Sequence, residues 1–302
     1  MSTNPTPPDE SKLTERCTVL RGWVESPGCG ILALAYDDLL AQKVEHSLIV
    51  RMGGAGARLI GKLKWETRAV FSAPDGQVRS IGARGRVATI GATLSVESIA
   101  TDLDRPGVVG LVRDGTFCAP DTCYALALDA RLFQWGGGGG WRMIVAPRDD
   151  VGLHRIAQGA VGAGDLLAAS IDGRVFHLEG GQWVDIGLPS SAIVNYIWRM
   201  PDGQFLACGL GGLLVRGSPG RAVILEHDYG FENFWSICEL SGQVYVSSLS
   251  HLYQLLPSGK LQRVDPLGAA SYHLLHATRD VLWSIGAKDV LELNQGQWSR
   301  IL

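Results

Sequence analysis

A short apolar run recurs seven times along this chain of 302 residues, at an almost constant spacing. The clearest copy is the stretch 203–208, which reads GQFLAC. When the other copies are aligned with it, the first apolar position falls on Leu32, Val78, Tyr124, Leu166, Phe205, Val244 and Leu282. The steps between these anchor residues are 46, 46, 42, 39, 39 and 38. Each repeat is therefore one structural unit of roughly 40 residues.

A repeat of this length built from short strands is typical of a propeller in which each repeat forms one blade. A single four-stranded blade cannot bury both of its faces, so the blades must stack side by side and close into a ring. The sequence therefore predicts an all-β fold, a seven-bladed β-propeller with four antiparallel strands in each blade. The boundaries of the first three blades stay open, because their connections are longer.

The fourth repeat, about residues 154–189, shows how one blade is encoded. The stretch 165–170 is apolar with small residues, which suits a strand buried between neighbouring blades. A tight turn follows at 171–173, and 174–178 then alternates polar and apolar residues as the next strand. The outer strand is expected at 182–186. Its tryptophan recurs on other outer strands, where a large ring fills the space between blades near the rim, at Trp141, Trp183 and Trp298.

Composition excludes several classes of function. The formal net charge is only −3, which does not provide the basic surface that nucleic-acid binding requires. No apolar run approaches the roughly 20 residues of a membrane span. Residues 1–12 are polar and rich in proline, unlike a secretory signal. We expect a disordered tail at 1–12 and a single propeller domain over 13–302, within which residues 13–20 are the one candidate for a strand that latches onto another blade.

Six cysteines in a chain without a recognisable signal peptide indicate free thiols in the cytoplasm. Cys118 and Cys123 flank a turn, so a disulfide or a metal site there is the alternative. A zinc site needs two further ligands, and no second Cys or His pair lies at metal spacing. No metal and no cofactor are therefore expected. The aspartates of the turns at 73–76, 119–122 and 200–203 are expected to serve turn geometry, because each follows a proline.

On these blade repeats, the chain resembles the broad superfamily of seven-bladed propellers that includes the WD40, YVTN and Kelch proteins. The resemblance covers about residues 17–302 and concerns architecture, because the Gly-His and Trp-Asp marks of WD40 repeats are absent. The stretch 170–173 (SIDG) is similar to the Asp-box of sialidase-type propellers, but its glycine comes one residue early and the box is not repeated. The resemblance therefore implies a fold and no activity.

One face of such a ring gathers the loops that lead into each innermost strand (the lead-in loops) and the loops between each second and third strand (the middle loops). The lead-in loop of the sixth repeat is the richest in aromatic residues, and such residues make good protein-recognition surfaces. For Phe234 the alternative is packing along the inner strand. The predicted partner-binding residues are Tyr229, Phe231, Glu232, Phe234, His227, Asp228, Tyr196, Asn195, His154 and Tyr272.

These observations favour a non-enzymatic, cytoplasmic binding protein that docks a protein partner on the loop face and contacts neither nucleic acid nor membrane. An immunity protein that neutralises a bacterial toxin fits this description, and so does a scaffold or regulatory subunit. The alternative is a hydrolase or lyase that acts on a small molecule at the channel mouth, where a metal site joining His154, His227 and His273 is conceivable. His227 and Asp228 are sequence neighbours with no serine or cysteine visibly placed beside them, so no catalytic set is predicted.

Overall fold

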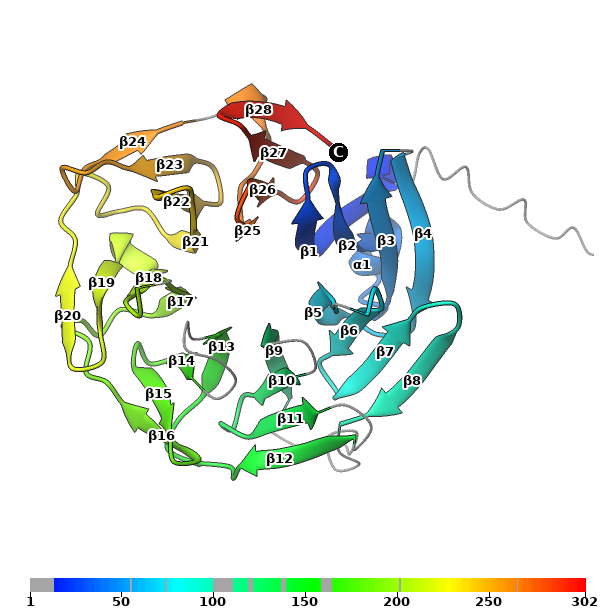
Figure 1. Cartoon of the computed structure of the whole chain (residues 1–302), viewed down its shortest axis with the longest axis horizontal. Coiled ribbons are helices and arrows are strands. Elements are labelled where there is room, and N and C mark those ends of the chain that lie inside the picture. The colour runs from blue at the N-terminus through cyan, green and yellow to red at the C-terminus, as the bar shows by residue number, and fades with distance from the viewer. Residues whose placement is uncertain are drawn as a thin grey trace, which may run out of the picture.

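Seven four-stranded antiparallel sheets are arranged around one axis in this computed structural model (Figure 1). It describes residues 14–54, 56–73, 75–99, 111–118, 122–136, 140–158, 165–200, 202–264 and 266–302. The tail predicted at 1–12, the turn residues 119–121 and most of the glycine loop at 136–140 lie outside the described residues. The prediction of a seven-bladed propeller is confirmed.

Each blade is formed by four consecutive strands. Blades 1 to 4 consist of β1 (Cys17–Ser26), β2 (Cys29–Tyr36), β3 (Ser47–Gly53) and β4 (Gly56–Leu63); β5 (Thr67–Ser72), β6 (Val78–Gly82), β7 (Arg86–Ile90) and β8 (Leu94–Ser98); β9 (Val112–Cys118), β10 (Thr122–Ala127), β11 (Leu132–Gly136) and β12 (Trp141–Val145); β13 (Leu153–Gln158), β14 (Leu166–Ser170), β15 (Val175–Glu179) and β16 (Gln182–Asp185).

The remaining three blades follow the same order. They consist of β17 (Val194–Arg199), β18 (Phe205–Gly209), β19 (Leu214–Ser218) and β20 (Arg221–Ile224); β21 (Phe234–Leu240), β22 (Gln243–Ser248), β23 (Leu252–Leu255) and β24 (Leu261–Arg263); β25 (Leu274–Ala277), β26 (Val281–Ile285), β27 (Val290–Asn294) and β28 (Gln297–Arg300). The first strand of each blade lies nearest the axis and the fourth lies at the rim (Figure 1).

In the residues that the structure describes, helical structure is confined to short turns. The α-helix α1 (Asp37–Ala41) lies in the middle loop of blade 1, and single 3-10 turns lie at Thr14–Arg16, Leu210–Gly212 and Pro266–Gly268. In the described part of the chain, none of the helices has the length and apolar character to span a membrane.

All seven anchor residues lie on the second strand of their blade, and this strand is buried on both sides. On β2, Leu32 and Leu34 pack in a cluster shared with blade 7, whereas Ile31 and Ala33 pack in a cluster shared with blade 2. Seven such clusters occur, one at each blade interface. A strand buried on both faces is mostly apolar or small, which explains why this run is the strongest repeat signal.

The ring closes between blade 7 and blade 1 without exchange of a strand. Residues 17–20 belong to β1 and pair with β2 of their own blade, so the latch considered for residues 13–20 is wrong as far as the structure describes them. Closure depends instead on the packing of the buried Trp283 against blade 1 and on hydrogen bonds across the seam. The carboxylate of Glu292 accepts from Trp283 Nε1 at 2.9 Å and from the backbone nitrogen of Gly28 at 2.7 Å.

The outer tryptophans and the cysteines behave largely as predicted. Trp183 is buried and donates from Nε1 to the carbonyl of Ala130 in the preceding blade, whereas Trp141 and Trp298 are half-buried at the rim. The described thiols are free, including Cys123, which stands opposite Phe117 in the β9–β10 ladder. Cys123 therefore gives no support to the alternative disulfide with Cys118, whose side chain lies outside the described residues.

A candidate protein-binding face

The lead-in loops and the middle loops lie on the same side of the ring and are held together by backbone hydrogen bonds. At the interface of blades 5 and 6, the nitrogen of Gly212 donates to the carbonyl of Glu232 at 2.5 Å. At the next interface, the nitrogen of Tyr272 donates to the carbonyl of Leu249 at 3.1 Å. These bonds fix the loops relative to one another, so the loop face is a preformed surface.

Exposed apolar side chains are distributed unevenly over the molecule. Several lie on the outer strands, at Leu94, Val96, Met143, Val184, Val223 and Ile224. The others lie on the loop face, at Val44, Leu111, Ile171, Phe231, Leu249 and Leu267. Among the described residues, the hairpins of the opposite face contribute no large exposed apolar side chain. The loop face is therefore the side of the ring that offers apolar area to a partner.

Phe231 is the most exposed of these side chains, with 81% of its surface accessible. It lies in the lead-in loop of blade 6, which the imidazole of His227 holds in place. His227 Nδ1 accepts a hydrogen bond from the backbone nitrogen of Tyr229 at 3.0 Å, which leaves Nε2 to donate to the carbonyl of Gly212 at 2.7 Å. Leu249 and Leu267, about half exposed, occupy the next two loops along this part of the ring.

The structure divides the predicted residues of this loop into two groups. Phe231 and Asp228 are exposed, whereas Phe234 is completely buried at the start of β21. Tyr229 is half-buried, because its ring lies 4.7 Å from that of Tyr253. Phe234 therefore belongs to the core rather than to a contact surface, and Tyr229 contributes packing as well as an exposed edge.

Two further predicted residues of this blade, Glu232 and His227, orient the loop. The Glu232 carboxylate lies 3.3 Å from Nδ1 of His251 in the middle loop of the same blade. With the backbone bond to Gly212, this contact ties the lead-in loop to two middle loops. Both residues are half-buried, so each combines a positioning role with partial access to a partner.

The remaining predicted residues lie closer to the axis. Asn195 is buried, and its side-chain nitrogen donates to the carbonyl of Phe234 at 2.8 Å, joining blades 5 and 6. Tyr272 is also buried and packs between blades 6 and 7. The ring of Tyr196 lies under the guanidinium of Arg155, and Arg155 Cζ is 5.3 Å from the centre of that ring. Burial and the neighbouring Arg155 lower the pKa of His154 to about 4. Asn195 and Tyr272 are thus structural, which corrects their assignment to a binding surface.

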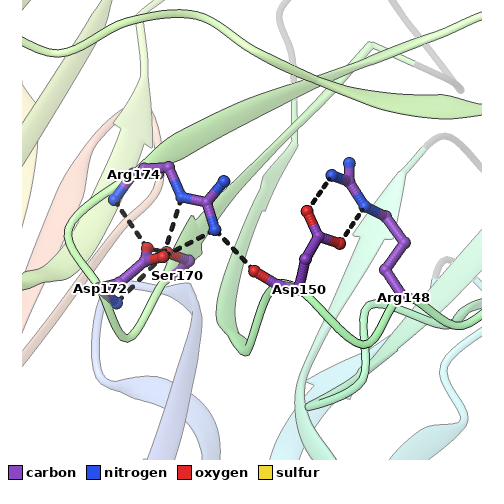
Figure 2. Close-up of polar contacts among 5 residues, drawn as sticks. All are labelled: Arg148, Asp150, Ser170, Asp172 and Arg174. Carbon is purple, nitrogen blue, oxygen red and sulfur yellow. Dashed lines mark hydrogen bonds and ion pairs between the residues drawn. The ribbon is translucent and has the colours of Figure 1, made fainter.

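Two ion pairs lie on the lead-in loop and the middle loop of blade 4 (Figure 2). Both Nε and Nη2 of Arg148 donate to the carboxylate of Asp150, at 3.0 and 2.7 Å. Arg174 donates from Nε to Asp172 at 2.8 Å and from Nη2 to the carbonyl of Asp150 at 2.8 Å, which links the two pairs. The bidentate pair of Arg148 and Asp150 is held in one geometry, and ion pairs of this kind suit the polar rim of an interface.

Asp172 is further fixed by its own turn. It contacts the hydroxyl of Ser170 and, with the Arg174 hydrogen bond as the largest cause, the pKa of its carboxyl is lowered to about 2. These residues belong to the stretch 170–173 that is similar to an Asp-box. In this structure they brace a middle loop with an internal ion pair.

The structure shows three exposed aliphatic residues on the loop face that the sequence analysis did not predict. Ile171, Leu249 and Leu267 were absent from the predicted site, although each is about half exposed on the loop face. The sequence signal that could have identified them is an aliphatic residue in a loop rather than in a strand. No group of three or more metal-ligating side chains forms within the described ranges, so the conceivable site at His154, His227 and His273 does not assemble there.

Known proteins similar to this chain agree with the fold. No protein-family model matches the chain. The protein named Immune protein Tsi7 from Pseudomonas aeruginosa is 29% identical over 304 residues, an alignment that covers 96% of this chain and 99% of Tsi7. The similarity therefore extends over essentially the whole of both chains.

Two solved structures share the propeller architecture. YCF48 bound to D1 peptide superposes with a TM-score of 0.69 at 14% identity, over 92% of this chain and 91% of that one. The WD40 propeller domain of Doa1 superposes with a TM-score of 0.70 at 11% identity, over 94% of this chain and 92% of that one. At these identities the likeness concerns the fold alone.

Proposed function

We propose that this chain is an immunity protein, which neutralises a toxin by binding it on the loop face of the propeller. The observation that carries the proposal is the end-to-end similarity to Immune protein Tsi7. Of the two sides of the ring, only the loop side carries large exposed apolar side chains among the described residues, which supports the choice of face. Such a protein acts by occupying its partner, so it requires a rigid binding surface and no catalytic group.

The centre of the proposed surface consists of Phe231, Leu249 and Leu267, which lie on consecutive loops of blades 6 and 7. Aromatic and aliphatic anchors at the centre of an interface account for most of the binding energy in protein complexes. The ion pairs Arg148–Asp150 and Asp172–Arg174 form part of the polar rim. Because hydrogen bonds between loops fix the anchors, little conformational entropy is lost on binding.

We propose a cytoplasmic location for the protein. The support is chemical: Cys17, Cys29, Cys123, Cys208 and Cys238 are free thiols, and disulfides form readily in oxidising compartments. Fractionation of the native host should place the protein with cytoplasmic markers. Recovery with periplasmic markers after osmotic shock would contradict this part of the proposal and leave the binding face unaffected.

Co-expression with the toxin that it is proposed to neutralise tests the proposed function. Cells that express the toxin alone should stop growing, and cells that also express this chain should grow normally. The purified pair should elute as one complex from a size-exclusion column. An unrelated toxin serves as the control, because protection by occupation is specific to one partner. Loss of growth despite ample folded protein would contradict the proposal, and turnover of a small molecule by the purified protein would favour the hydrolase or lyase alternative.

A further inference from the structure

The axis of the ring contains a cavity of about 540 Å³. Residues from all seven innermost strands line it, from β1, β5, β9, β13, β17, β21 and β25 (Figure 1). Cavities of this size hold small organic molecules in many proteins. The cavity is separate from the loop-face anchors described above, none of which lines it.

A β-bulge recurs at the same place on six of the seven innermost strands. Each bulge lies near the start of the strand, where one residue is skipped in the pairing with the second strand, and the skipped residues are Leu20, Arg68, Arg113, His154, Asn195 and Trp235. A bulge turns neighbouring side chains toward one side of the strand. The repeated bulge thus accounts for a concentration of long polar side chains around the axis at one level.

Arginine dominates the polar lining of the cavity. Among the described residues, four arginines line it, Arg21, Arg68, Arg155 and Arg199, against a single carboxylate, Asp114. Arg155 lies 3.6 Å from Asp114. Arg68 pairs with Glu66 at 3.1 Å and Arg199 pairs with Asp165 at 3.2 Å, but these two carboxylates lie outside the lining. The lining itself therefore has an excess of positive charge.

Arg21 differs from the other three, because within the described residues its guanidinium donates to backbone carbonyls only. Its Nε donates to the carbonyl of Arg68 at 2.9 Å and its Nη1 to that of Leu20 at 2.7 Å. Other donors are unused: Nε of Arg68 and both Nε and Nη1 of Arg199 are buried and find no acceptor among the described residues. The side chain of Arg199 is only 7% exposed. Buried guanidinium donors without acceptors are uncommon, since each costs desolvation free energy.

The lowered pKa values of several basic groups around the axis agree with this excess of positive charge. Burial, followed by the charge of Arg155, lowers the pKa of Arg21 to about 10, so Arg21 stays protonated at neutral pH while its charge is opposed. Burial and Arg68 likewise lower the pKa of Arg113. The pKa of His273 falls to about 4 because of burial, Arg21 and Arg155. Mutual repulsion of this kind is relieved when an anion binds between the cations.

We propose that the central cavity is a binding site for a small organic anion, whose carboxylate or phosphate group is held by Arg21, Arg68 and Arg155. Guanidinium groups bind both oxyanions with paired hydrogen bonds. Trp23, Tyr196 and Trp198 also line the cavity and offer ring surfaces to the organic part of the ligand. The site does not depend on the proposed toxin binding, because it is built from the inner strands.

Calorimetric titration of the full-length protein tests this site. Citrate and phenyl phosphate are the two probes, each added in a chloride buffer of constant ionic strength. Binding of citrate alone assigns the carboxylate, binding of phenyl phosphate alone assigns the phosphate, and either result supports the proposal. Absence of measurable heat from both probes at millimolar concentration would overturn it.

Two variants and a control locate the binding. Arg68→Gln removes a cavity guanidinium whose side chain is about a quarter exposed, so the fold should tolerate it. Arg21→Gln tests the deeper position, and circular dichroism shows whether it folds. Loss of one charge-assisted hydrogen bond should weaken binding about tenfold or more. The control Arg216→Gln changes the same charge on β19, outside the cavity, and should leave the affinity within about twofold. Equal effects of Arg68→Gln and Arg216→Gln would overturn the assignment.

Discussion

The backbone nitrogen of Val24 donates a hydrogen bond to Nδ1 of His276 at 3.1 Å, across the seam where the last blade meets the first. The two residues are 252 positions apart in the chain, and their contact helps to close the ring. Nδ1 accepts this bond only while it carries no proton. Burial lowers the pKa of His276 to about 4, which keeps the ring neutral at physiological pH. The seam therefore contains a group that must stay neutral to accept this hydrogen bond, so protonation by acid opposes closure of the ring.

Stability should fall as the pH is lowered from about 6.5 to about 4. The unfolded chain binds a proton at His276 near the ordinary value of 6.5, whereas the folded chain binds it only near 4. The contribution of neutral His276 to the free energy of unfolding is thus fully present above pH 6.5. It decreases between the two pKa values, by about 1.4 kcal/mol per pH unit. His154 and His273, with pKa values also near 4, add to the same slope.

Urea denaturation at a series of pH values measures this slope. The variant His276→Gln keeps a hydrogen-bond acceptor for Val24 and removes the titrating group. The slope of its free energy of unfolding against pH should therefore be smaller by up to about 1.4 kcal/mol per pH unit. His154 and His273 keep titrating in this variant, so part of the slope of the natural protein should remain. A free energy of unfolding that is constant between pH 6.5 and 4.5 would contradict the prediction.

The second prediction concerns the other polar contact at the seam. Replacement of Glu292 by alanine removes the acceptor for Trp283 Nε1 and for the nitrogen of Gly28. Trp283 is completely buried, so its donor would be left without a partner. We expect the free energy of unfolding to fall by about 2–3 kcal/mol. Replacement of the exposed Glu226 should change it by less than about 0.5 kcal/mol. Equal values for the two variants would show that Glu292 does not stabilise the seam.

A third prediction concerns the ion pair of Asp172 and Arg174 on the loop face (Figure 2). Because the folded pKa of Asp172 is below its ordinary value, the pair stabilises the protein above about pH 4 and loses this contribution as the pH falls toward 2. The Asp172 side chain is 47% exposed, so solvent screening limits the effect to less than about 1 kcal/mol. Chemical denaturation should show a small loss for Asp172→Asn at pH 7 that shrinks below pH 4. A loss of several kcal/mol at pH 7 would show that the pair is more than a surface contact.

The blade repeat could be predicted from the sequence because one strand per blade is buried on both faces and is therefore mostly apolar or small. The second strand faces a neighbouring blade on each side, so residues such as Ile31 and Leu32 must both be apolar. The first strand of each blade faces the central cavity, so its side chains there need not be apolar. A bulge also adds one residue to six of these strands, so alternation does not show that Arg21 and Arg155 face the same cavity. The cavity therefore had no visible signature.

The loop face was predictable in outline and not residue by residue. Loops have no periodicity, so the sequence could not show that Tyr229 packs on Tyr253 while Phe231, two residues later, is exposed. Asn195 and Tyr272 look like surface residues in a sequence, since both are polar and follow loops. Their burial arises from contacts with neighbouring blades, which only the closed ring creates.

Native cysteines should differ sharply in reactivity. Burial raises the pKa of the Cys17 thiol to about 11 and that of Cys123 to about 12, and it raises those of Cys208 and Cys238 further. The thiolate is the reactive form, so these four should resist iodoacetamide in the folded protein. Cys29 is half-buried and should react first. Mass spectrometry after alkylation without reductant should find all of these thiols free once the protein is unfolded, and two blocked thiols would contradict this.

The last prediction tests the face on which the proposed toxin binds. Phe231→Ala and Leu249→Ala together remove two exposed anchors of adjacent loops. Each hot-spot side chain contributes roughly 2 kcal/mol or more, so the double variant should bind its toxin more weakly by a factor on the order of 10³. Both side chains lie largely in solvent, and the melting temperature should therefore stay unchanged.

The matched control is Val223→Ala together with Ile224→Ala, two exposed apolar residues on the outer strand β20. Removal of this rim pair should leave affinity within about twofold, because the rim of blade 5 is not part of the loop face. Surface plasmon resonance with the immobilised toxin measures both variants. If the rim pair weakens binding and the loop pair does not, the toxin binds the outer edge of the ring, and growth protection by co-expression would still hold. The two experiments thus separate the choice of face from the proposed function itself.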